Sequence, residues 1–273
     1  MDKEHYLINR LSSNYIGDDA AVVGDRLYSM DAFFEGTHFK REWMSMAQIG
    51  RKAMLVNLSD AIAMNATPQF ALVTLSLPQE LTKEEIDLLV ESLEETAGEY
   101  GCEIIGGDTV AGEKLHLSIT IISRSTTPLY RKGLHLGDLL AYTGTLGESK
   151  RDLEKLFRGE TIAADSRFFM PKLRQEFVAQ ARPFLHAGMD ISDGLYCDTN
   201  KLLERNGYGF DLVNPIADAI GFSGEEYEML VAFERVHLEK LQEIATACGT
   251  TLTVFAEVTE GKRRFPCKSH HFS

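Results

Sequence analysis

The sequence is short of basic residues. Lys and Arg together number 28 against 41 Asp and Glu, so the formal net charge is −13 at pH 7. Proteins that bind the phosphate backbone of nucleic acids depend on a basic face. We therefore do not expect a nucleic-acid partner.

Cysteine is also scarce. Its four positions form no C-x-x-C pair and are widely spaced: Cys102, Cys197, Cys248 and Cys267. This spacing favours neither a zinc site nor a disulfide framework. We interpret all four as buried thiols in a reducing cytosol.

Long apolar runs and several catalytic motifs are missing as well. The start "MDKEHYLINR" has no apolar signal core, and no run approaches the roughly 18 residues of a membrane span. We expect a soluble cytoplasmic protein without a membrane partner. G-x-x-x-x-G-K-[ST], G-x-S-x-G and H-E-x-x-H do not occur, which leaves a P-loop, a serine nucleophile of that type and a zinc protease without support.

What is present is an alternation of strand and helix patterns. Two helices are well marked: one from the N-cap Ser45 to Met64, and one from Thr82, whose capping box includes Glu85, to Gly101. Strands are expected at 26–31, 68–78, 102–107, 114–123, 139–144, 228–234 and 251–258, and further helices near 149–158, 172–181, 188–207 and 236–249. This pattern predicts an α/β fold (α+β) in two halves, 1–136 and 137–273.

Seven aspartates occupy apolar or glycine-rich settings in five separate segments. They are Asp18, Asp19, Asp31, Asp60, Asp108, Asp190 and Asp193. Helix caps and turns would explain Asp108, after two glycines, and Asp193, before Gly194. They explain Asp60 least well, because it lies inside an apolar helical segment where Asp has poor propensity. The position of Asp60 indicates that something other than local helix structure requires a carboxylate there.

Carboxylates without His or Cys ligands suit hard cations, and Mg²⁺ in particular binds carboxylates together with water and substrate phosphates. The doublet Asp18–Asp19 in "YIGDDAAVV" is typical of a site that binds a cation. A phosphate compound is therefore the expected substrate. Calcium storage is a structural rival, but "DISDGLYCDTNKLLE" has its glycine at the fifth position instead of the sixth that an EF-hand requires, so we reject that motif.

Two further residues have open interpretations. His38 in "EGTHF" is compatible with a ligand contact or with a packed, hydrogen-bonded histidine. Arg131 in "YRKG" is compatible with a solvated surface charge, or with a phosphate clamp if a nucleotide binds nearby.

In order along the chain, "GDDAAVV", "MDAFFEGTHF", "NLSDAIAMNATP", "GGDT", "GMDISDGL", "SGEEYEML" and "AEVTEG" resemble the motif series of the thiamine-monophosphate kinase family. This family is grouped with aminoimidazole ribonucleotide synthetase and selenophosphate synthetase. The resemblance implies metal ligands at Asp18, Ser29, Asp31, Asp60, Asp108, Asp190 and Asp193. It implies nucleotide contacts at Gly107, Asp108, Arg131 and Ser192, and substrate contacts at His38, Glu225 and Phe272.

The resemblance also implies an activity and an assembly. The activity is transfer of a phosphoryl group from ATP to thiamine monophosphate with Mg²⁺, giving thiamine diphosphate without a covalent nucleophile or a general base. The N-terminal half, with a mixed sheet, would form a homodimer and the ATP site, and the C-terminal half would be an α/β sandwich-like unit. One departure is Glu226, where the family has Asp.

Two alternatives to this activity remain. A selenophosphate synthetase needs a reactive cysteine near its N-terminus, whereas the first cysteine here is Cys102 in a predicted strand. A catalytically silent homologue that binds metal or nucleotide is the second alternative.

Overall fold

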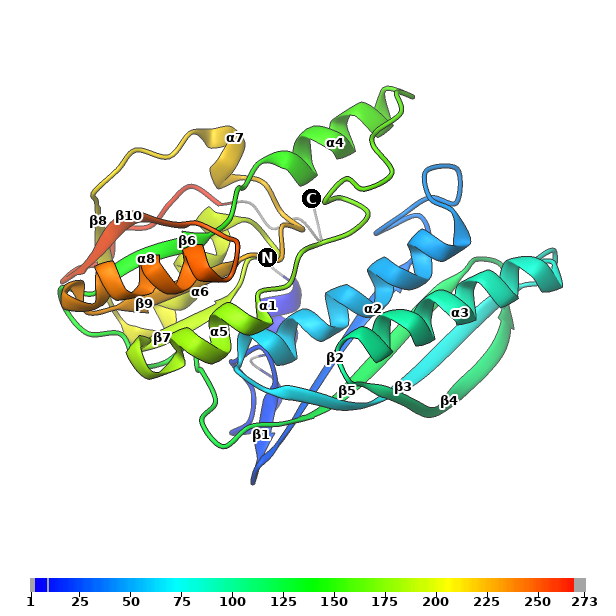
Figure 1. The fold of residues 1–273 in the computed structure, drawn as a ribbon, viewed down its shortest axis with the longest axis horizontal. Helices are drawn as coiled ribbons and strands as arrows, with labels where there is room; N and C mark the ends of the chain where they lie inside the picture. Colours follow the sequence, from blue (N-terminus) through cyan, green and yellow to red (C-terminus); the bar gives the residue numbers. More distant parts are fainter. Residues whose placement is uncertain (1–2, 9, 268–273) are drawn as a thin grey trace.

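Two five-stranded sheets organise the chain in the computed structural model, which describes residues 3–8 and 10–267 (Figure 1). The first half contains α1 Lys3–Ile8, β1 Ala21–Val23, β2 Arg26–Phe34, α2 Met46–Ala63, β3 Thr67–Pro78, α3 Lys83–Glu99, β4 Glu103–Gly112 and β5 His116–Arg124. The second half contains β6 Leu139–Thr143, α4 Glu148–Phe157, α5 Gln175–Ala181, η1 Arg182–Phe184, β7 Ala187–Asp190, α6 Leu195–Asn206, β8 Gly209–Leu212, α7 Asp218–Gly221, β9 Met229–Phe233, η2 Arg235–His237, α8 Leu238–Ala247 and β10 Leu252–Thr259. The expected two-part α/β architecture is confirmed.

The N-terminal sheet has the strand order β1-β2-β5-β3-β4. Only β3 and β4 run parallel, so the sheet is mixed, and α3 supplies the crossover that a parallel pair requires. Helices α2 and α3 cover one face of this sheet (Figure 1). Alternate residues of β5, Leu117, Ile119 and Ile121, are fully buried against them, as the sequence pattern predicts.

The predicted capping box of α3 is present, and the predicted N-cap Ser45 of α2 forms a second one. Ser45 Oγ accepts a hydrogen bond from the backbone N–H of Gln48, whose side chain accepts one from the Ser45 N–H, and Thr82 and Glu85 repeat the arrangement in α3. Helix α2 is buried over most of its surface, because α3, the sheet and β7 all pack against it. Polar residues inside α2 therefore face protein on every side and need specific partners.

The C-terminal sheet is antiparallel, with the strand order β7-β9-β6-β10-β8. Its central strands β6 and β9 are buried along their whole length, which explains their uninterrupted apolar sequences. Helices α5 and α8 pack on one face through residues such as Phe177 and Leu241, and α6 packs on the other through Leu202 and Leu203. Sheet and helices together form a second core.

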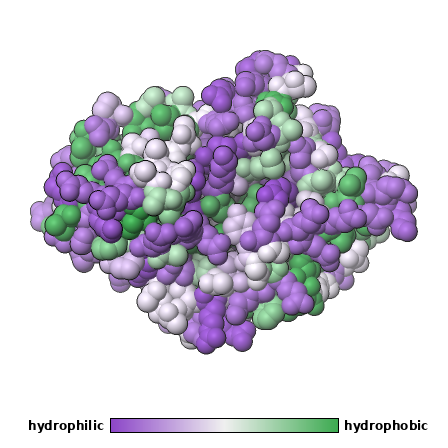
Figure 2. All heavy atoms as spheres, in the orientation of Figure 1, coloured by the Kyte–Doolittle hydropathy of each residue, from purple (hydrophilic) through white to green (hydrophobic). Residues whose placement is uncertain are grey.

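The surface matches the acidic composition. The face shown in Figure 2 is mostly hydrophilic, with apolar side chains in small separate groups. None of the helices in the described part of the chain combines the length and apolar character that a membrane crossing requires.

Two sequence-based expectations are wrong. Cys197 in α6 and Cys267 near the end of the described chain form a disulfide, with Cα atoms 5.2 Å apart, so only Cys102 and Cys248 are free thiols among the four. Spacing in the sequence did not reveal this pair because 70 residues separate its members. In addition, Asp31 does not end its strand, since β2 continues to Phe34 with Asp31 paired to Ile119 of β5.

Candidate active site

Three carboxylates meet where α2 packs against β7. Asp19 comes from the loop before β1, Asp60 from α2 and Asp190 from the end of β7. One oxygen of each lies within 4.8 Å of the others, close enough to hold a single cation. Thus, segments that are far apart in sequence converge on one point.

Burial and mutual repulsion make these acids unusually hard to ionise. Burial raises the pKa of Asp190 to about 8, with the charge of Asp19 adding to the effect. Burial also raises the pKa of Asp60 well above its ordinary value, and Asp31 and Asp190 raise it further. The pKa of Asp19 is raised by burial too, although Arg131 opposes the shift. Ionising the whole cluster therefore costs free energy that a bound cation would offset.

Two buried oxygens near this point lack a hydrogen-bond partner within the described residues: Asp19 Oδ2 and Ser29 Oγ. Ser29 lies on the same face of β2 as Asp31, which faces α2 closely enough for its charge to raise the pKa of Asp60. Buried polar atoms normally have partners, so these two oxygens indicate that a ligand or ion binds beside them. An all-oxygen donor set of this kind fits Mg²⁺.

Arg131 contacts both members of the aspartate doublet. Its backbone N–H donates to Asp18 Oδ1 at 2.7 Å, and its Nε donates to Asp19 Oδ1 at 2.9 Å. Its side chain is mostly buried, and Asp19 raises its pKa against the effect of that burial. Asp19 belongs to the three-carboxylate cluster, whereas Asp18 accepts a hydrogen bond from the Arg131 backbone. The doublet itself was the signal in the sequence that could have identified Asp19.

The loop after β7 carries a second group of charges. Asp193 forms an ion pair with Lys201, which also donates to Asp198 Oδ1 at 3.0 Å. Asp198 is completely buried, and burial raises its pKa to about 6. The backbone N–H of Asp193 donates to Asp198 Oδ2 at 3.0 Å. Asp193 is thus placed beside the cluster by Lys201 and Asp198, two residues that the sequence interpretation missed.

The structure does not bring Asp108 to the carboxylate cluster. In β4, Asp108 is in register with Thr74 of β3 and lies on the sheet face away from α2, where Oδ1 accepts a bond from the Thr109 N–H. Its neighbour Gly107 packs so closely on β3 that an added Cβ would overlap the Val73 carbonyl. Glycine is therefore required at this position on packing grounds alone.

Glu225 lies in a strained loop that is bound to the segment after β7. Its φ of 55° is unusual for a residue with a side chain, and its N–H donates to the Ser192 carbonyl at 2.7 Å. Its carboxylate pairs with Lys52 of α2 at 2.5 Å, and Lys52 Nζ lies 3.8 Å from the centroid of the Phe168 ring. Lys52 is fully buried, so Glu225 compensates its charge. The sequence interpretation missed Lys52, although a lysine in the apolar stretch "RKAMLVNL" was a signal.

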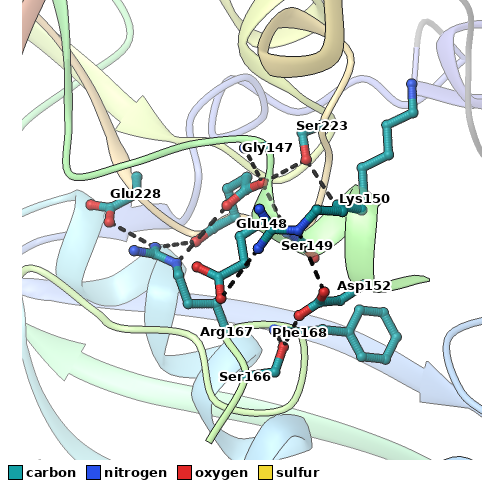
Figure 3. Close-up of polar contacts among 12 residues, drawn as sticks. Gly147, Glu148, Ser149, Lys150, Asp152, Ser166, Arg167, Phe168, Ser223 and Glu228 are labelled. Atoms are coloured by element: carbon teal, nitrogen blue, oxygen red, sulfur yellow. Dashed lines mark hydrogen bonds and ion pairs between the residues drawn. The ribbon is translucent and has the colours of Figure 1, made fainter. Parts of the chain in front are cut away.

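The rest of this loop is held by a buried polar network (Figure 3). Glu226 Oε1 accepts bonds from the N–H groups of Gly147 at 2.7 Å and Ser149 at 3.2 Å, and from Ser223 Oγ at 2.5 Å. It thereby satisfies donors at the start of α4. Glu228 pairs with Arg167 at 2.7 Å on the other side of the loop. Glu226 is therefore a structural residue here.

His38 is a packed, hydrogen-bonded side chain. Its Nδ1 accepts the Phe34 N–H at 2.9 Å, and its ring stacks on Phe33 with the centroids 5.9 Å apart. It is only partly buried, so a face stays accessible beside these contacts. Phe272, the third expected substrate contact, lies outside the described residues.

Comparison with known protein families first indicates the class of protein to which the N-terminal half is similar. The family model described as "AIR synthase related protein, N-terminal domain" matches residues 17–124, which contain Asp19, Asp60 and the whole N-terminal sheet. The first sheet, with Asp19 and Asp60, is thus similar to the N-terminal domain of AIR synthase-related α/β proteins.

The nearer relatives narrow this class. The thiamine-monophosphate kinase of Aquifex aeolicus is 32% identical over 249 residues, 81% of each chain, and that of Leptospira interrogans is 32% identical over 256 residues, 86% of this chain and 81% of the other. The solved structure "AaThiL complexed with AMPPCP and TMP" aligns with a TM-score of 0.86 and 27% identity over 97% of this chain and 94% of that one. The chain belongs to the thiamine-monophosphate kinase family.

Proposed function

We propose that the protein transfers the γ-phosphoryl group of ATP to the phosphate of thiamine monophosphate, giving thiamine diphosphate and ADP. The observation that carries this proposal is the convergence of Asp19, Asp60 and Asp190 beside Arg131 in a chain of this family. The related structure with AMPPCP and TMP supports the same pair of substrates.

The carboxylates are assigned to metal binding. Asp19, Asp60 and Asp190 would hold Mg²⁺, with the unpartnered Ser29 Oγ as a further oxygen donor. Bound Mg²⁺ supplies neutralisation of the phosphate charge that spreads over the transferring group. Asp18 supports this site by its hydrogen bond to the Arg131 backbone, and Asp193 supports it by its ion pair with Lys201. The same acids, without a cation, would repel the polyanionic substrates.

Arg131 is assigned to the ATP phosphates. Its guanidinium contacts Asp19 and is anchored through its own backbone to Asp18, so its position is fixed before any nucleotide binds. A fork of N–H donors at a fixed position can stabilise charge that develops during transfer at little reorganisation cost. Gly107, Asp108 and Ser192 stay in the proposal as nucleotide contacts. For Asp108 to contact ATP, the nucleotide has to reach the face of the N-terminal sheet that points away from α2.

No residue is needed as a general base or a nucleophile. The acceptor is a phosphate oxygen that is already ionised at neutral pH, so no proton has to be removed before it attacks. The task of the protein is to align two anions in line and to offset their repulsion. The thiamine end is proposed to lie toward Glu225 and His38, with Phe272 as a third contact.

We also propose two domains, 1–136 and 137–273, and a homodimer through the N-terminal one. The boundary falls between β5 and β6. The outer face of the N-terminal sheet carries exposed apolar side chains at Tyr28, Met30, Leu72 and Val110. Contiguous apolar patches on a sheet are typical of subunit interfaces. ATP as a substrate favours a cytoplasmic location.

The alternative is a silent homologue that binds ligands without turnover. Isothermal titration with a non-hydrolysable ATP analogue, thiamine monophosphate and Mg²⁺ tests the binding half of the proposal. Binding of both substrates, strengthened by Mg²⁺ and weakened by Asp60→Asn, is the expected result. A protein that binds neither substrate would exclude the proposed kinase activity and leave only a scaffold.

A further inference from the structure

A second group of ligand-type side chains lies away from the carboxylate cluster. His135, Asp138 and His186 each offer one nitrogen or oxygen within 4.8 Å of the others. His186 follows η1 and precedes β7, whereas His135 and Asp138 belong to the turn "HLGD" before β6. The group therefore joins two chain segments, and neither the carboxylate cluster nor the proposed reaction uses it.

The geometry of this group is well defined. His186 Nδ1 lies 2.9 Å from Asp138 Oδ1, and the rings of His135 and His186 meet edge to face with their centroids 4.3 Å apart. The His135 N–H donates to Asp138 Oδ2 at 2.9 Å, which fixes the carboxylate against the turn. Asp138 is buried, His186 is partly exposed and His135 is exposed, so the group opens to solvent on the histidine side.

An Asp–His hydrogen bond alone would be an ordinary structural contact. The second imidazole is what changes the chemistry, because two nitrogens and one carboxylate oxygen make the three-ligand set of a transition metal that keeps a position for water. Ligand atoms around zinc stand roughly 3.4 Å apart, given bonds of about 2.1 Å in a tetrahedron. Small side-chain rotations would bring the three atoms from their present separations to that spacing.

We propose that His135, Asp138 and His186 form a binding site for a divalent transition-metal ion of the zinc type. Imidazole nitrogen favours such an ion over Mg²⁺, which prefers oxygen alone. The site lies at the start of β7 and Asp190 lies at its end, so about 13 Å of strand separates the two sites at roughly 3.3 Å per residue. The two sites can therefore be occupied independently by different ions.

The position of the site suggests a structural role. His135 follows Arg131 by four residues, and His186 precedes Asp190 by four. The two segments already touch, since the Gly188 N–H donates to the Tyr130 carbonyl at 3.0 Å. A metal bound by both histidines would cross-link the loop that carries Arg131 to the strand that carries Asp190, and would stabilise the folded protein by mass action.

The test is a Co²⁺ titration of the full-length protein without a histidine tag, followed by visible absorption, with excess Mg²⁺ present to occupy the carboxylate cluster. His135→Ala removes one ligand from an exposed position and should leave the fold intact. His237→Ala is the matched control, because His237 packs on Phe184 and belongs to no ligand group among the described residues. Asp60→Asn controls for binding at the carboxylates, and a double His270→Ala, His271→Ala variant controls for the C-terminal pair.

We expect one Co²⁺ per chain, with a low-symmetry absorption band that Zn²⁺ abolishes by displacement. His135→Ala should weaken binding by more than about tenfold, and the three control variants should leave it unchanged. Zn²⁺ should also raise the melting temperature of the wild type more than that of His135→Ala. The proposal is overturned if the wild type gives no band, if His135→Ala leaves the band intact, or if any control variant abolishes it.

Discussion

Ser59 Oγ donates a hydrogen bond of 2.6 Å to Asp190 Oδ2, and both residues are buried. Ser59 belongs to α2, which packs on the N-terminal sheet, and Asp190 ends β7 at the edge of the C-terminal sheet. This bond orients one carboxylate from the second sheet toward two from the first half. The geometry of the cluster therefore depends on how α2 packs against β7.

Replacing Asp60 with Asn should separate stability from activity. The change replaces a carboxyl whose ionisation is opposed by burial and by its acidic neighbours, and it keeps the shape of the side chain, so the metal-free variant should melt no lower than the metal-free wild type. Turnover should fall by about 10²–10³, the usual effect of losing one electrostatic contact to a transition state. Thermal melts with and without Mg²⁺ and ATP, together with steady-state assays, check both halves. Normal turnover in the variant would remove Asp60 from the site.

Metal binding should release protons near neutral pH. The pKa of Asp190 is raised to about 8, so at pH 7 this carboxyl keeps a proton in the metal-free folded protein that it has lost in the unfolded chain. The contribution of Asp190 to stability should therefore fall as the pH rises from about 4 toward 8. Mg²⁺ requires the ionised carboxylate, so its binding should expel a proton. Calorimetric titration with Mg²⁺ in two buffers of different ionisation enthalpy measures this release. Equal heats in both buffers, or release undiminished in Asp190→Asn, would contradict the prediction.

The Lys52–Glu225 ion pair should show strong coupling. Glu225→Gln leaves the fully buried Lys52 without its counter-charge and should cost about 1–3 kcal/mol of unfolding free energy. Lys52→Met removes the buried charge, so the double variant should be more stable than Glu225→Gln alone. Chemical denaturation of all four proteins completes the cycle. Additive effects of the two substitutions would show that the pair contributes no coupling.

The disulfide should contribute measurably to stability. It closes a loop of 70 residues, for which chain entropy predicts about 4 kcal/mol. Reduction, or Cys267→Ser, should lower the denaturation midpoint, whereas Cys248→Ser should not, because Cys248 is a free thiol. A midpoint that does not respond to reducing agent would contradict this prediction and show that the bond does not form in solution.

The outer face of the N-terminal sheet should mediate self-association. Met30 is 65% exposed and Leu72 is 39% exposed on that face, so sedimentation at micromolar concentration should show a dimer. Met30→Lys should weaken it, since a charge buried at an interface without a partner is costly. Val236→Lys is the control, because Val236 is at least as exposed, at 71%, but lies in η2 of the other half. A wild type that sediments only as a monomer would count against the homodimer.

Sequence patterns predicted the fold where the signals were local. The starts of α2 and α3 follow from the capping residues Ser45 and Thr82, whose bonds involve only their own first turns. β7 was missed because its four residues are too few for a periodic pattern, and its motif was assigned to the following helix. Asp31 was placed at a strand end, although pairing with β5 carries the strand onward.

The site was predictable only in part. Each aspartate stood out against its apolar or glycine-rich surroundings, but which of them converge depends on tertiary packing. Asp60 and Asp190 meet through the contact of α2 with β7, whereas Asp108, which stood out equally in its glycine-rich setting, lies on the sheet face away from α2. The pairing of Cys197 with Cys267 and the burial of Lys52 against Glu225 are likewise set by segments that are distant in sequence.

The most direct test of the central claim is a product assay. Purified protein is incubated with ATP, Mg²⁺ and thiamine monophosphate, and ADP and thiamine diphosphate are separated by chromatography and quantified, with Asp60→Asn as the parallel control. The account predicts one thiamine diphosphate for each ADP, with both products reduced about 10²–10³-fold in the variant. ADP that accumulates without thiamine diphosphate, or absence of both products from the wild type, would contradict it.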